Sequence, residues 1–106
     1  MLDRYDYKTA ISVIDSLVTE IGTDSRSIAE HREEVIDLAL QKARCLRRLY
    51  RMQESVEVLA EVLYLDQFNI ELMADLAESH MQVGNTMEAF TLYGTLSRMQ
   101  PENPYF

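Results

Sequence analysis

The sequence predicts an all-α protein of about five antiparallel helices that stack into an α–α superhelix, or solenoid. Three observations favour this class. Glycine and proline are scarce, at three and two in 106 residues, which leaves little material for tight turns. Apolar residues recur at helical spacing along most of the chain. The stretches between these periodic segments are short, and short connections place consecutive helices antiparallel.

The first half of the chain is expected to hold two helices. One spans residues 4–20 and ends at Gly22. The next is expected to begin at a capping box of Ser27 and Glu30 and to continue without glycine or proline to about Tyr50. Its predicted inward stripe consists of Ile28, Val35, Leu38, Ala39, Ala43, Leu46 and Leu49, with Lys42 as a single polar interruption.

Three shorter helices are expected in the second half, over residues 53–65, 70–83 and 86–99. Asn69 is a suitable N-cap for the middle helix, Gly84-Asn85 forms the turn after it, and Pro101 ends the last helix. The residues predicted to face inward are Val56, Leu59, Ala60, Leu63, Met73, Leu76, Ala77, His80, Ala89, Tyr93 and Leu96.

The chain repeats itself with a period of 34 residues. After a shift of this length, Ala77 falls on Ala43 and Ala89 falls on Ser55, so small residues recur at the same phase of each helix pair. A further copy of the second helix of the pair falls at the start of the chain, offset by 45 residues. One helix pair cannot bury its apolar face alone, whereas stacked pairs form a continuous core.

A helix-turn-helix period of 34 residues with this pattern resembles the tetratricopeptide repeat (TPR). The best copy is residues 70–103, whose matches are Leu76, Ala77, Gly84, Ala89, Tyr93 and Pro101. Met73 and His80 depart from the Trp and Tyr that the family favours. Residues 24–69 form a degenerate long-helix repeat, and residues 4–22 form half a repeat. In the degenerate copy, the expected Leu, Gly and Pro are replaced by Lys42, Tyr50 and Gln67.

The resemblance implies a single TPR-like domain over residues 1–106, with a concave groove that binds a protein or peptide without catalysis. On this register the second and fourth helices line the groove. Its expected residues are Arg44, Arg47, Arg48, Glu71, Ala74, Glu78, Met81 and Gln82. Some members bind acidic C-terminal tails through a clamp of Lys, Asn and Arg. Only Arg44 could serve at the matching positions here, so that activity is not expected.

The segment KARCLRRLYR holds half of the ten basic residues of the chain. Two interpretations are open. Guanidinium groups one turn apart, as at Arg44 and Arg48, can clamp a carboxylate or phosphate of a partner. Alternatively the arginines pair with the next first-type helix, where Glu71, Asp75 and Glu78 fall opposite them. We favour pairing, because charge pairs between neighbouring helices are common.

Charge argues against nucleic acid as the partner. The formal net charge is −8. All of it falls on residues 52–106, where nine acidic groups accompany only one basic residue, Arg98. Such a surface repels phosphate backbones and otherwise serves solubility. The sequence shows neither a basic start followed by an apolar leader nor an apolar run of about 18 residues, which predicts a cytoplasmic protein without a membrane segment.

Residues suited to catalysis or metal binding are sparse. Cys45 is the only cysteine and is expected to pack as a small apolar residue. His31 lies beside Glu30 and Glu34 on a charged helix, where a solvated surface is a better expectation than a metal site. His80 is expected to pack in the repeat core with one ring nitrogen hydrogen-bonded. No Ser-His-Asp order or glycine-rich phosphate loop occurs, so neither an enzyme nor a cofactor is expected.

A second hypothesis is structural rather than ligand-binding. The first and last predicted helices lack a covering helix, and solenoids usually need caps. Either the chain is a piece of a longer array, or its edges stack on another subunit. The residues expected at these edges are Leu2, Tyr5, Tyr7, Leu92, Tyr105 and Phe106.

Overall fold

The structure is a computed structural model that describes residues 4–22 and 24–102. All regular structure within these residues is helical. The elements are α1 (Arg4–Ile21), α2 (Ser25–Glu30), α3 (Arg32–Arg48), α4 (Met52–Val62), the 3-10 turn η1 (Leu63–Leu65), α5 (Ile70–Val83) and α6 (Thr86–Met99). The predicted all-α class is confirmed.

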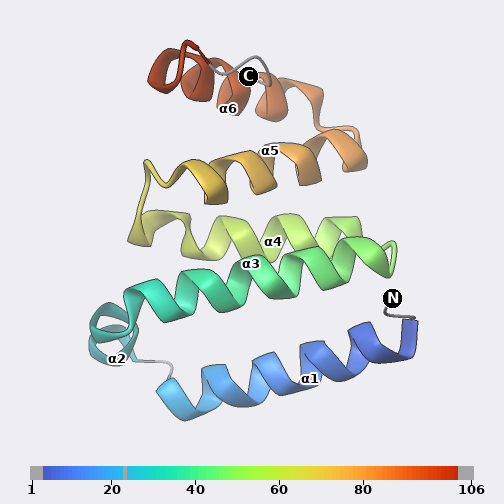
Figure 1. The fold of residues 1–106 in the computed structure, drawn as a ribbon, viewed down its shortest axis with the longest axis vertical. Coiled ribbons are helices and arrows are strands. Elements are labelled where there is room, and N and C mark those ends of the chain that lie inside the picture. Colours follow the sequence, from blue (N-terminus) through green and yellow to red (C-terminus); the bar gives the residue numbers. More distant parts are fainter. Residues whose placement is uncertain (1–3, 23, 103–106) are drawn as a thin grey trace.

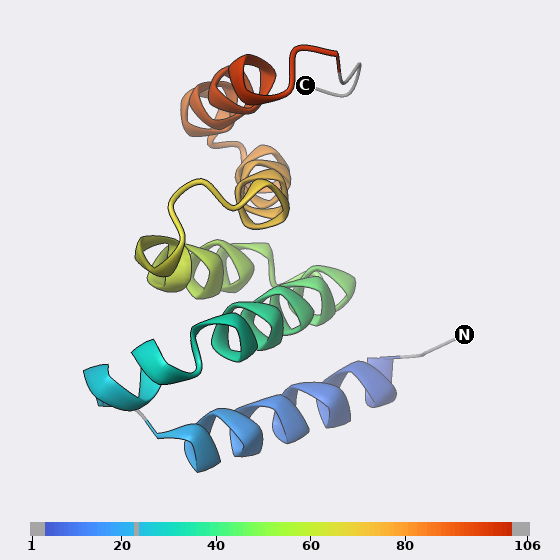
Figure 2. The same ribbon diagram turned by 60° about the vertical axis from the view of Figure 1, so that its left-hand side comes forward.

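The helices stack in the order in which they occur in the chain (Figure 1). Helix α1 packs against α3, α3 against α4, α4 against α5, and α5 against α6. Consecutive long helices run in opposite directions, as the short connections predict (Figure 1). In both views α1 lies at one end of the described stack and α6 at the other (Figure 2). Helix α3 also contacts α5, and this contact between alternate helices positions the site described below.

Helices α3, α4 and α5 contribute the central hydrophobic core. Its buried residues are Ile36, Leu40, Ala43, Val56, Leu59, Leu72 and Leu76. Leu59 and Leu72 have no exposed surface. Complete burial of one such side chain stabilises the fold by about 1.5–3 kcal/mol, so this cluster holds the middle of the stack together.

Helices α5 and α6 begin and end where the sequence predicts. Asn69 caps α5, since the backbone N–H of Leu72 donates to Asn69 Oδ1 at 3.0 Å. Gly84 adopts a left-handed conformation with φ of 96°, and Asn85 N donates to His80 O at 2.8 Å, which ends α5. Helix α6 ends shortly before Pro101, which disfavours helical backbone at the residue before it.

The single long helix expected from Ser27 to about Tyr50 is wrong, because the chain breaks it at His31. His31 has φ −115° and ψ 32°, outside the helical region. Its backbone N–H and its ring Nδ1 lie 3.1 and 3.0 Å from Ser27 O. Because a carbonyl oxygen can only accept, Nδ1 carries the hydrogen. The imidazole and the backbone N–H of His31 thus share one acceptor at the end of α2, and the helix ends there without glycine or proline.

The predicted capping box is also wrong. Asp24 caps α2, since Ser27 N donates to Asp24 Oδ2 at 3.1 Å. Glu30 does not reach back toward Ser27 but accepts from Arg26 Nε at 3.1 Å. Hydrogen bonds from Ser27 lower the pKa of the Asp24 carboxyl, as expected when donors stabilise the ionised form of a cap.

Helix α3 has two buried faces, where the sequence predicted one stripe. Ile36 and Leu40, which the stripe omitted, belong to the central core with residues of α4 and α5. On another side, Lys42 reaches α1 and donates from Nζ to Asp15 Oδ1 at 2.7 Å. Because α3 lies between α1 and α4, its polar interruption is a partner for α1 and not a defect in the stripe.

Most of the remaining inward predictions are confirmed, with one error. The buried ones are Val56, Leu59, Met73, Leu76, Ala77, Ala89 and Leu96, while Leu63, His80 and Tyr93 are half-buried. Ala60 is exposed, because no described residue covers that side of α4. The helix predicted over residues 53–65 also tightens: α4 ends at Val62, and its last turn continues as the 3-10 turn η1.

The 34-residue period has a counterpart in the backbone. Tyr50 has φ of 61° and Gly84, 34 residues later, has φ of 96°. Arg51 N donates to Leu46 O at 2.8 Å, and Asn85 N donates to His80 O at the same distance. The α3–α4 turn and the α5–α6 turn therefore close with the same hydrogen bond at the same phase of the repeat. Both residues adopt a left-handed backbone conformation, which is strained for Tyr50 but not for Gly84.

Replacing Gly84 by alanine is expected to lower the free energy of unfolding by about 1–2 kcal/mol, the cost of a left-handed L-residue. The added Cβ would meet no atom within 4 Å, so the effect comes from the backbone alone. The matched change Tyr50→Gly is expected to raise the free energy of unfolding by less than about 1 kcal/mol, because the freedom of glycine in the unfolded chain offsets part of the relief. Urea denaturation measures both. A loss of stability in Tyr50→Gly would contradict the equivalence of the two turns.

Candidate functional site

A surface pocket of about 550 Å³ lies between α3 and α5, at the C-terminal end of α3. Its lining residues are Arg44, Arg47, Arg48, Tyr50, Met52, Asp75, Glu78 and Gln82. Five of the eight residues predicted for the groove are among them. The contact between α3 and α5 creates the pocket, because it brings the arginine-rich face of one helix against the acidic face of the other.

Asp75 is the centre of the ion pairs between the two helices. Arg44 Nε donates to Asp75 Oδ2 at 3.0 Å, and Arg47 Nη2 lies 3.8 Å from the same oxygen. Arg44 also donates from Nη2 to Glu71 Oε1 at 2.7 Å. The bond to Glu71, followed by Asp75, raises the pKa of the Arg44 guanidinium. The pairing interpretation of the arginine cluster is therefore confirmed for Arg44 and Arg47.

Two buried serines continue this network into the core. Arg47 donates from Nη1 to Ser79 Oγ at 3.0 Å, and the hydroxyl oxygens of Ser79 and Ser55 are hydrogen-bonded at 3.0 Å. Ser55 Oγ in turn donates to Met52 O at 2.7 Å. Both serines have no exposed surface, and the Arg47 side chain is only 12% exposed. The network ties α3, α4 and α5 together and fixes Arg47 in one orientation.

Other polar residues of the pocket have no such restraint. Arg48 and Gln82 are exposed, and neither forms a hydrogen bond or an ion pair with any described residue. Glu78 is exposed on α5. Partial burial of Tyr93 raises the pKa of its hydroxyl, and the negative charge of Glu78 raises that pKa further. The pocket thus combines two fixed arginines with polar groups that are available to a ligand.

The structure separates three predicted groove residues from the pocket. Glu71 pairs with Arg44 but does not line the pocket. Ala74 is half-buried on α5, and Met81 is 44% exposed on the same helix, outside the pocket. Sequence reasoning missed Tyr50 and Met52 as lining residues. Their signal is the helix end, since Tyr50 lies in the turn that follows α3 and Met52 begins α4.

The two histidines and the cysteine lie outside the α3–α5 pocket. Asn85 Nδ2 lies 3.1 Å from His80 Nδ1, which confirms the predicted hydrogen bond on one ring nitrogen. His31 lines a different pocket, near α1. Cys45 is half-buried, and burial raises the pKa of its thiol, as suits a packing residue. Within residues 4–22 and 24–102, no three His, Cys, Asp or Glu residues are placed to hold a metal ion.

The structure describes the side chains of two of the six residues expected at the edges that would stack on another subunit. Leu2, Tyr5, Tyr105 and Phe106 lie outside the part of the chain whose side chains the structure describes. Tyr7 and Leu92 are half-buried.

No described helix combines the length and the apolar character needed to cross a bilayer. No family model, no curated protein and no solved structure matches this chain.

Proposed function

We propose that this chain is a non-catalytic protein-interaction module, built of TPR-like helix pairs, that binds a peptide segment of another protein in the α3–α5 pocket. The observation that carries the proposal is the pocket itself, which contains five of the eight predicted groove residues and an exposed Arg48 that has no partner among the residues the structure describes. A polar, open pocket between two helices suits a peptide better than a small apolar ligand.

The TPR-like part of the proposal is supported by features that recur at one phase. Ala43 and Ala77 are both fully buried, and so are Ser55 and Ala89. The turn between α3 and α4 and the turn between α5 and α6 close with matching hydrogen bonds. Contact between α3 and α5 places the first helices of successive pairs side by side, which is the arrangement that produces a groove in a helical solenoid.

The chemistry of the pocket favours a peptide with a carboxylate. Arg44 and Arg47 are held by α5, so they contribute shape and a fixed field but are not free to move toward a ligand. Arg48 has no carboxylate partner within the described chain and can form a bidentate pair with an Asp or Glu side chain. Tyr50 and Met52 supply apolar surface beside it for a neighbouring side chain of the peptide.

Site-specific photo-crosslinking tests the proposal. A benzoylphenylalanine at Gln82, which lines the pocket, is expected to capture a partner from an extract of the source cells, whereas the same group at the exposed Gln67 is not. Arg48→Glu is expected to abolish the capture. Arg32→Glu, an equal charge change at an exposed position outside the pocket, is expected to leave it intact. Capture that is the same from both positions, or that survives Arg48→Glu, would contradict the assignment.

A specific observation also favours oligomerisation as a second candidate. Met87 is 76% exposed and Phe90 is 62% exposed on α6, at one end of the described stack (Figure 1). If this face joins subunits, light scattering should give a mass of at least twice 12.3 kDa, and the double change Met87→Ser and Phe90→Ser should restore the monomer. A wild-type mass of 12.3 kDa at all concentrations would exclude self-association as the function.

A further inference from the structure

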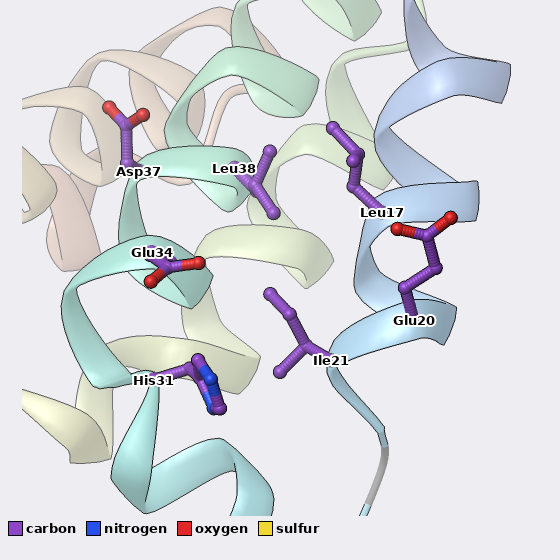
Figure 3. A pocket seen from close by; sticks show the side chains of 7 residues that line it. All are labelled: Leu17, Glu20, Ile21, His31, Glu34, Asp37 and Leu38. Atoms are coloured by element: carbon purple, nitrogen blue, oxygen red, sulfur yellow. The ribbon is translucent and has the colours of Figure 1, made fainter.

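A second pocket, of about 410 Å³, lies between the C-terminal end of α1 and the start of α3. Leu17, Glu20 and Ile21 line it from α1, and His31, Glu34, Asp37 and Leu38 line it from the other side. Figure 3 shows the two sets facing each other across the gap between the helices. None of these residues belongs to the α3–α5 pocket, which lies at the opposite end of α3.

The centre of this pocket is apolar. Leu17 and Ile21 point from α1 toward α3, and Leu38 points from α3 toward α1 (Figure 3). Leu17 remains 41% exposed despite this position. An aliphatic chain laid along these three side chains would remove apolar surface from water. The methylene stems of lysine and arginine are chains of this kind, with a charge at the far end.

The rim of the pocket is acidic and includes no lysine or arginine. Glu20 and Glu34 lie on opposite sides of the apolar centre (Figure 3). Neither forms an ion pair or a hydrogen bond with a described residue, whereas Asp37 accepts from Gln41 Nε2 at 2.8 Å. Elsewhere between α1 and α3, the carboxylate of Asp15 has its cation, Lys42, at 2.7 Å. Asp15 of α1 is thus paired with Lys42 of α3, whereas Glu20 and Glu34 form no ion pair with any residue that the structure describes.

His31 lines the pocket with a side chain that is held by a hydrogen bond. Its Nδ1–H is used by Ser27 O at 3.0 Å, which fixes the ring at the end of α2. No lysine or arginine lines the pocket. Carboxylates close to an apolar centre favour a ligand that combines a positive charge with an aliphatic stem.

From this complementarity we propose that the α1–α3 pocket binds a lysine or arginine side chain of a partner protein. The stem would lie along Leu17, Ile21 and Leu38, and the charged group would lie between Glu20 and Glu34. This goes beyond the proposed function, because the site lies at the other end of α3, is completed by α1 in place of α5, and selects the opposite charge. A partner that carried an acidic and a basic residue at suitable spacing would contact both ends of α3.

The proposal can be tested by NMR titration of the ¹⁵N-labelled chain with the peptide acetyl-Leu-Lys-Leu-amide. The expected result is a saturable shift of amide signals confined to residues 17–21 and 31–38, which weakens as sodium chloride is raised. The matched peptide with Nε-acetyl-lysine keeps the stem but loses the charge. It is expected to bind about threefold to tenfold more weakly, in keeping with two solvent-accessible ion pairs.

Matched double variants separate this site from general attraction to an acidic protein. Glu20→Gln with Glu34→Gln should weaken the lysine peptide as much as acetylation does. Glu33→Gln with Glu57→Gln removes the same charge from exposed positions outside the pocket and should have no effect. Equal weakening by both pairs, or shifts spread over the whole acidic surface, would overturn the proposal. Shifts at the pocket that depend on protein concentration without peptide would overturn it in favour of a second copy.

The same titration distinguishes this proposal from the function of the α3–α5 pocket. Arg48→Glu should leave binding of the lysine peptide unchanged, because Arg48 lies at the other end of α3. Loss of partner capture in that variant with unchanged peptide binding would show two independent sites. Weaker peptide binding in Arg48→Glu would contradict the separate α1–α3 site.

Discussion

Replacing Leu59 by alanine is expected to cost about 2–5 kcal/mol of unfolding free energy. Leu59 is fully buried in the cluster where α3, α4 and α5 meet. Its removal would leave a cavity between three helices that are held by other contacts and can close it only in part. A loss of this size is a large fraction of the total stability of a small domain.

Urea denaturation of Leu59→Ala measures this loss, and Leu17→Ala is its matched control. Leu17 is also a leucine on a helix, but it is 41% exposed on α1. Its replacement is expected to cost less than about 1 kcal/mol, because much of its surface stays in water in the folded state. Similar losses in the two variants would show that the stack does not depend on the core shared by α3, α4 and α5.

Asp75→Ala is expected to lower the free energy of unfolding by about 1–3 kcal/mol, which is large for a residue at the edge of a pocket. The Asp75 side chain is 14% exposed and accepts from Arg44 at 3.0 Å. Without it, the Arg47 guanidinium would stay almost buried beside Ser79 with no carboxylate to balance it. Leaving a charge in that state costs more than the pair itself contributes.

The matched control for Asp75→Ala is Glu71→Ala. Glu71 also pairs with Arg44, at 2.7 Å, but its side chain is 61% exposed. Its removal is expected to cost less than about 1 kcal/mol, the range of solvent-exposed ion pairs. Thermal denaturation at low and at high salt separates the two variants. Equal losses would mean that the burial of Arg47 has no energetic consequence.

Arg48 is a better position than Arg44 for a substitution that tests partner binding. A glutamate at Arg44 would face Glu71 and Asp75, so its effect on a partner could not be separated from its effect on stability. Arg48 lies one turn away and leaves the ion pairs of Asp75 intact. Arg48→Glu should therefore change the melting temperature little while it weakens binding. This is the reason for its use in the crosslinking experiment.

The sequence alone defines best those helices whose ends are marked by capping or helix-breaking residues. For α5 and α6, Asn69, Gly84 and Pro101 mark the boundaries, and local backbone preferences fix their roles. The break at His31 has no such mark. It depends on the hydrogen bond from the His31 side chain to Ser27 O. This bond competes with continuation of the helix, and residue propensities do not predict it.

The burial pattern of α3 was harder to predict because it depends on two neighbours. A single stripe describes a helix that packs on one side, but α3 packs against α1 as well as α4. Ile36 and Leu40 therefore belong to the core, and Lys42 becomes a partner of Asp15. The helix-pair register correctly placed the arginines opposite Glu71 and Asp75. The α1–α3 pocket could not be predicted, because it depends on how closely α1 approaches the start of α3.

The most direct test of the central claim is an NMR map of the partner segment recovered by crosslinking, titrated as a synthetic peptide into the ¹⁵N-labelled chain. The amide signals that shift are expected to cluster on both walls of the α3–α5 pocket, around Arg48, Glu78 and Gln82. Arg48→Glu is expected to remove these shifts without altering the rest of the spectrum. Shifts confined to the outer face of α6, around Met87 and Phe90, would contradict the claim and identify that face as the interaction surface.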